Sequence, residues 1–162
     1  MLRVSTFLSR FALAIAVTSA VLITSGCGGN KNRTPLSELT PPNGGTLVEL
    51  GEGRNYLEIL VDREAGILEI RTLDKDATTP VRTSNEGLEL KVAVGAGEER
   101  FLILTPIANA ATGEFAGNTP LYRGDAPWLK TTEALQVRVE RVIVKGKRFD
   151  AVQTTVPARP PA

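Results

Sequence analysis

Short apolar runs separated by turn residues fill residues 46–156, and this spacing constrains the fold more than any other feature. Turns marked by glycine, proline and paired polar residues recur about every ten residues, which is typical of strands joined by short loops. Within a run such as 67–73, apolar and charged side chains alternate. A two-residue period indicates a strand with one buried face. No apolar pattern with a helical period persists here, so we expect an all-β fold.

The strand-like runs are numerous enough for a single antiparallel β-sandwich of about seven to nine strands. We expect strands at 46–50, 56–62, 67–73, 81–83, 88–94, 100–105, 121–123, 135–144 and 148–156. The run 101–104 (FLIL) is apolar throughout, which predicts burial on both faces of the sheet. Along 135–144 the apolar positions change phase near Arg141, which predicts a β-bulge there.

The first 26 residues predict an export signal. Arg3 and Arg10 precede an almost wholly apolar stretch at 11–23. This stretch is shorter than the run of about 20 apolar residues that a membrane-spanning helix needs. A basic start, a short apolar segment and small residues before a cleavage site are the parts of a signal peptide. We therefore expect residues 1–26 to be removed.

Cys27 is the only cysteine, and the residues that end on it read ITSGC at 23–27. This sequence resembles the lipobox of bacterial lipoproteins. The resemblance implies that a diacylglycerol is attached to the Cys27 thiol and that the new amino terminus is acylated after cleavage. Several acyl chains anchor a protein stably, whereas one chain is marginal. Gly28 stands where an aspartate retains lipoproteins at the inner membrane, so the resemblance implies an outer-membrane protein that faces the periplasm.

Composition limits the functions of the mature chain. Without Arg3 and Arg10 it carries 17 basic and 18 acidic side chains, so no net charge favours nucleic acid as a partner. Histidine is absent, which removes the commonest metal ligand and general base. We expect no metal site, no cofactor and no catalytic residue set. Segment 27–45 predicts a flexible tether, 46–156 the β domain, and 157–162 a disordered, proline-rich tail.

Two aromatic residues in the irregular stretch after residue 107 form the candidate binding site. Tyr122 and Trp128, together with Arg123, are residue types that anchor protein partners or stack on sugars. Loops on a rigid β scaffold are frequent binding positions. The alternative interpretation is structural: Trp128 fills one end of the sandwich beneath a long loop, because large aromatic side chains are usually buried.

Glu58 and Glu69 lie across a predicted hairpin from one another. Paired carboxylates hydrolyse glycosidic bonds when their separation is fixed and one of them has a raised pKa. Exposed strand positions do not supply that environment, and Arg71 is close in the sequence. We therefore interpret both glutamates as surface residues.

Part of the domain resembles a pattern in small, largely uncharacterised bacterial envelope proteins and in N-terminal segments of periplasmic adaptors from heavy-metal efflux systems. The resemblance covers about residues 42–94 and rests on 44–51 (GGTLVELG), 56–58 (YLE), 66–68 (GIL) and 72–74 (TLD). It implies a β fold and an envelope location. Asn43 and Tyr56 stand where those relatives often carry histidine.

We therefore expect a lipid-anchored protein of the bacterial envelope that acts as a binding or structural module and is not an enzyme. Its expected partners are the membrane, through the N-terminal lipid, and another envelope protein. Two alternatives remain open at this point. One is an accessory module of metal efflux or metal handling, and the other is a carbohydrate-directed binder.

Overall fold

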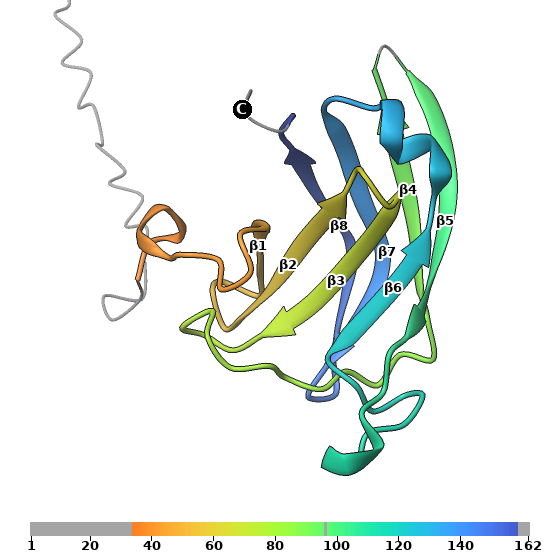
Figure 1. Cartoon of the computed structure of the whole chain (residues 1–162). Coiled ribbons are helices and arrows are strands. Elements are labelled where there is room, and N and C mark those ends of the chain that lie inside the picture. The colour runs from red at the N-terminus through yellow and green to blue at the C-terminus, as the bar shows by residue number, and fades with distance from the viewer. Residues whose placement is uncertain (1–33, 96, 159–162) are drawn as a thin grey trace, which may run out of the picture. The chain divides into compact units, whose positions relative to one another are not determined.

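A computed structural model describes residues 34–95 and 97–158, and the eight strands in this part of the chain form one antiparallel sheet (Figure 1). The strands are β1 (Thr46–Leu50), β2 (Asn55–Asp62), β3 (Ile67–Leu73), β4 (Leu88–Val94), β5 (Glu98–Pro106), β6 (Leu121–Asp125), β7 (Leu135–Val144) and β8 (Lys147–Val156). Three short 3-10 helices complete the described elements: η1 (Leu36–Glu38), η2 (Ala110–Thr112) and η3 (Pro127–Thr131). The predicted all-β, antiparallel fold is confirmed.

The strand order in the sheet is β1-β2-β3-β6-β5-β4-β7-β8. Hairpins join β1 to β2, β2 to β3, β4 to β5 and β7 to β8, while β6 lies between β3 and β5. The sheet curls so that its two edge strands, β1 and β8, approach one another. It is therefore nearly closed around a single main core.

The main core is built by the inward positions of every strand, as the two-residue alternation predicts. It contains side chains from both halves of the curled sheet, such as Leu57 and Ile70 on one side and Leu90 and Val137 on the other, all of them buried. Burial of each such side chain stabilises the fold by about 2 kcal/mol. The hydrophobic effect across the two halves therefore holds the curled shape.

β7 and β8 change phase together near the position where a bulge is predicted. The inward residue of β7 shifts from Val139 to Val142, and the inward residue of β8 shifts from Phe149 to Val152. The register is the same on both sides of this point, so neither strand gains a residue relative to the other and the predicted β-bulge is not formed. Ala151 accommodates the shift with a positive φ of 53°. Each strand thus leaves two consecutive residues outside the core, at 140–141 and 150–151.

A second, smaller core lies on the outer face of β1, β2 and β3. Tyr56, Leu73 and Ala77 are buried there, with Leu39 and Leu47 packed against them. Leu39 belongs to the segment expected to be part of a flexible tether. In the structure, Leu39 packs on this cluster at the outward side of β1, β2 and β3. This apolar contact holds residues 34–45 against the sheet.

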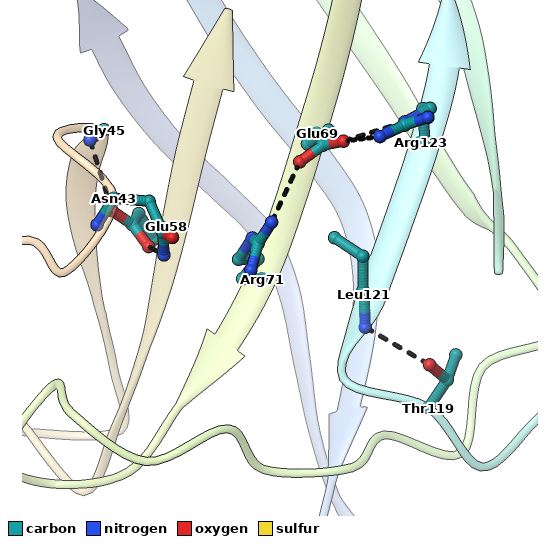
Figure 2. Close-up of polar contacts among 8 residues, drawn as sticks. All are labelled: Asn43, Gly45, Glu58, Glu69, Arg71, Thr119, Leu121 and Arg123. Atoms are coloured by element: carbon teal, nitrogen blue, oxygen red, sulfur yellow. Dashed lines mark hydrogen bonds and ion pairs between the residues drawn. The ribbon is translucent and has the colours of Figure 1, made fainter. Parts of the chain in front are cut away.

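Glu58 fixes the same segment by hydrogen bonds (Figure 2). Its carboxylate accepts from the backbone N–H of Asn43 (2.8 Å), from the Asn43 side-chain amide (2.7 Å) and from the backbone N–H of Gly45 (3.2 Å). Gly45 is required here, because a Cβ would lie 2.7 Å from the carbonyl oxygen of Ile59 and 2.8 Å from the Glu58 side chain. The interpretation of Glu58 as a surface residue is wrong: it is fully buried, because the turn at 41–45 covers it.

Two other local predictions differ from the structure. Residues 81–83 form no strand, and Thr83 makes only isolated bridges to Thr119 and Val144. Segment 101–104 is not buried on both faces. Leu104 is buried, but Phe101 and Ile103 point outward and are 73% and 66% exposed. Within residues 34–95 and 97–158, no element covers the outer face of β5 at these two residues, so they lack the second layer that their apolar character predicts.

We expect the Glu58→Ala substitution to lower the free energy of unfolding by about 3 kcal/mol, because the three hydrogen bonds to the buried Glu58 carboxylate are lost together. Urea denaturation followed by circular dichroism measures this change. Glu99→Ala, at an exposed position on β5, is the control, with an expected change within about 0.5 kcal/mol. Equal stability of the two variants would show that the Glu58 contacts contribute nothing.

Candidate functional site

Tyr122 lies in the main core and not on a binding surface. Its side chain is fully buried, and its hydroxyl donates to the carbonyl oxygen of Asn85 (2.7 Å) and lies within hydrogen-bond distance of the Thr83 hydroxyl. Burial raises the pKa of the Tyr122 phenol. Through these two hydrogen bonds Tyr122 links β6 to the segment before β4 inside the core, and its side chain is not available to a ligand.

Arg123 and Trp128 lie on different parts of the molecule. Arg123 points outward from β6 and bonds Glu69 on β3, with Nε at 2.7 Å from the carboxylate, while Arg71 bonds the other carboxylate oxygen at 3.3 Å (Figure 2). Trp128 in η3 packs against the main core, and the Arg100 guanidinium lies over its ring at 5.3 Å from the centroid. Because Tyr122 points into the core, the structure does not bring the three predicted residues together as one surface.

A first groove, of about 640 Å³, lies beside Arg123. It runs past Glu69, the turn at 43–46 and the end of β8. Its charged side chains bond protein groups: Arg63 donates to the carbonyl oxygens of Thr132 (2.9 Å), Glu133 and Pro157 (3.0 Å). These bonds tie the β2–β3 hairpin to the loop before β7 and to the end of β8. The groove is therefore better explained by packing than by ligand binding.

A second groove, of about 890 Å³, lies on the outer face of β4, β5, β7 and β8 and is called the Phe101 groove here. Its exposed apolar side chains are Phe101 and Ile103. The ionisable side chains that line it are Glu89, Lys91, Arg138, Glu140, Arg141, Arg148 and Asp150. Aromatic residues and arginine are enriched in protein interfaces, and neighbouring exposed apolar side chains rimmed by charged residues are a candidate docking surface.

The charged side chains of the Phe101 groove form two small networks. Glu140 lies 3.1 Å from Arg138 and 3.8 Å from Lys91. Asp150 lies 2.7 Å from Arg148 and 3.6 Å from Arg141. In each network one carboxylate is shared by two basic groups, so each keeps one positive charge in excess.

The shape of the Phe101 groove follows from the phase change in β7 and β8. β4 pairs with β7 only as far as Leu90 and Val139. Beyond this point the Asn85 side chain, and not β4, bonds the backbone of β7. Its amide N–H donates to the carbonyl oxygen of Arg141 (3.2 Å), and its amide oxygen accepts from the backbone N–H of Ile143 (2.7 Å). The four outward residues at 140–141 and 150–151 line the same groove. Irregular points of this kind in sheets often lie beside functional sites.

The sequence held only part of this site. The change of phase near Arg141 was readable from the apolar pattern, and the structure shows it at the groove. Phe101 and Ile103 were missed because four consecutive apolar residues are typical of a strand buried on both faces. Only the charged residues of the neighbouring strand, Glu89 and Lys91, signal that this outer face meets water: they lie opposite Ile103 and Phe101 in the ladder.

The comparisons with known proteins give no relatives: no protein-family profile, no curated protein and no solved structure matches this chain. Within residues 34–95 and 97–158, no three aspartate or glutamate side chains gather closely enough to hold a metal ion. None of the helical segments in this part of the chain has the length and apolarity to cross a bilayer. Cys27 and the segment 1–26, for which a signal peptide is predicted, lie outside the described residues.

We expect Tyr122→Phe to lower the free energy of unfolding by about 1–2 kcal/mol at neutral pH, because the Asn85 carbonyl loses its buried donor. Chemical denaturation measures the change. Phe115→Leu, on an exposed loop residue, is the control and should change stability by less than about 0.5 kcal/mol.

The raised pKa of Tyr122 gives a second signature, at alkaline pH. The unfolded chain loses the phenol proton near pH 10, before the folded protein does. Stability from this group is therefore present below about pH 10 and is lost as the pH rises toward the folded pKa. We expect the stability of the wild-type protein to fall more steeply than that of Tyr122→Phe above about pH 10. Parallel slopes for the two proteins in pH-dependent denaturation would contradict this account.

Proposed function

We propose that this chain is a lipid-anchored protein of the bacterial envelope that acts, without catalysis, by binding another envelope protein through the Phe101 groove. The sequence at 23–27 supports the anchor. The single observation that carries the binding role is the hollowed outer face of the sheet, where Phe101 and Ile103 are exposed beside arginine side chains. Such a face fits docking better than chemistry, because two of its three carboxylates, those of Glu140 and Asp150, are paired with basic groups.

The N-terminal segment suits such an anchored module. In the proposal, acylated Cys27 holds the chain at a bilayer, and the residues up to 33 separate it from the segment that is fixed on the sheet by Leu39 and Asn43. That fixed segment lies over β1, β2 and β3, whereas the Phe101 groove lies over β4, β5, β7 and β8. The attachment and the binding surface therefore use different halves of the sheet.

Mass spectrometry of the protein purified from its native membranes tests the anchor. We expect the mature chain to begin at Cys27 and to carry diacylglycerol on the thiol and an acyl group on the new amino terminus. The Cys27→Ser variant should lack these masses and leave the membrane fraction. A bare thiol at Cys27, or an intact residue 1–26 segment, would refute this part of the proposal.

Site-specific photo-crosslinking in intact cells tests the binding role. A photoreactive phenylalanine at position 103, inside the groove, should form an adduct with a defined envelope protein. The same group at Lys75, whose side chain is 72% exposed on the distant turn after β3, is the matched control and should give no such adduct. Identical adduct patterns at both positions, or none at 103, would contradict binding through this surface.

A further inference from the structure

The Phe101 groove combines two apolar side chains with an excess of basic groups, and this combination specifies a kind of partner. Phe101 and Ile103 lie two residues apart on β5, so their side chains project on one face about 7 Å from each other. An extended peptide presents alternate side chains at the same spacing. Two apolar side chains of an extended segment therefore match this pair in position.

The charges beside the apolar pair favour an acidic segment. Arg141 and Arg148 share the single carboxylate of Asp150, yet their side chains remain 57% and 55% exposed. Two guanidinium groups carry ten N–H donors, and one carboxylate has about four lone-pair sites to accept them. Donors therefore remain for a further carboxylate, which arginine binds in a two-pronged geometry.

Lys91 adds a cation directly at the apolar contact. Its ammonium lies over the Phe101 ring, 5.4 Å from the centroid, and only 3.8 Å from Glu140. Glu140 is the less exposed partner in its network, at 29%, against 40% for Arg138 and 33% for Lys91. In this network the basic side chains are therefore slightly more exposed than the carboxylate, and with Glu89 included the groove carries one net positive charge.

A bilayer or a second copy of this chain fits the groove less well. A membrane surface is flat, whereas this face is hollowed, and the carboxylates of Glu89, Glu140 and Asp150 would be pressed against anionic headgroups. A second copy would bring the same excess of positive charge to both sides of the contact. An extended acidic segment can enter the hollow and place individual carboxylates against the Arg141 and Arg148 guanidinium groups, whereas a headgroup layer would cover the acidic and basic side chains alike.

We propose that the Phe101 groove binds an extended, acidic segment of a partner protein, with alternate apolar side chains on Phe101 and Ile103 and carboxylates on Arg141 and Arg148. This inference rests on the proposed binding function and adds the chemistry of the partner. Truncating an apolar anchor residue at the centre of an interface costs tenfold or more in affinity. The charged contacts should make binding weaker as salt is added.

Fluorescence polarisation with synthetic peptides tests the proposal, using the purified mature protein in a nonionic detergent. The probes are two labelled peptides with the same Phe, Ile and Leu residues, which alternate with Asp and Glu in one and with Lys in the other. We expect the acidic peptide to bind and the basic peptide to bind at least about tenfold more weakly. Similar affinities for both peptides would overturn the proposal.

Matched variants locate the binding. Phe101→Ser should lower the affinity for the acidic peptide by about tenfold. Its control is Phe115→Ser, which removes a phenylalanine that is 62% exposed outside the groove and should leave the affinity unchanged. The double variant Arg141→Ala, Arg148→Ala should bind more weakly and lose most of the salt dependence. Arg54→Ala, at an exposed residue outside the groove, is its control. Equal effects of a groove variant and its control would refute the assignment.

Two further measurements exclude the other occupants. Flotation of the Cys27→Ser chain with vesicles of phosphatidylglycerol and phosphatidylcholine should show no binding that Phe101→Ser removes. Light scattering should show no self-association that Phe101→Ser removes. Either positive result would assign the groove to lipid or to a second copy and overturn the proposal. If position 103 forms a crosslinked adduct but the protein shows no preference for the acidic peptide, the proposed binding function stands. In that case only the inference that the partner segment is acidic is refuted.

Discussion

The unbroken register between β7 and β8 is the constraint on which the shape of the molecule depends. Both strands change phase at the same place, so the ladder continues and the inward positions still meet the core on each side. The change leaves two outward residues on each strand and requires the positive φ of Ala151. Since β4 has already parted from β7 at this point, the Asn85 side chain takes over the backbone partners. The core and the outer groove are therefore two results of one irregularity.

The regular strands were readable from the sequence because one physical rule governs them. Where one face of a strand is buried and the other meets water, apolar and polar residues alternate, and the bounds of β1, β3, β4 and β7 follow the pattern to the residue. The rule also located the change of phase near Arg141. This alternation rule, however, describes only strands with one buried face and one solvated face. Three residues that matter for the structure do not follow it.

Glu58, Tyr122 and Phe101 show why the rest was not predictable. Glu58 occupies an outward position that reads as solvated, but a segment 15 residues earlier in the chain folds over it. Tyr122 lies in an irregular stretch, and its burial depends on partners 37 and 39 residues away. Phe101 is apolar at a position that nothing in the described chain covers. For Glu58 and Tyr122 the deciding contact is distant in sequence, and for Phe101 the covering contact is missing from the described chain, so local patterns carry no information about either outcome.

The Arg63 side chain has a consequence for how the molecule comes apart. It reaches from the turn between β2 and β3 to the carbonyl oxygens of Thr132 and Pro157, and so it joins the β2–β3 hairpin to the loop before β7 and to the residue that follows β8. Among the described residues β1 and β8 share no ladder, so the bond from Arg63 to Pro157 is one of the contacts that hold the end of β8 at this seam. Fraying at the carboxyl end of β8 is thereby coupled to the β2–β3 hairpin, so loosening of this hairpin should also loosen the end of the chain's last strand.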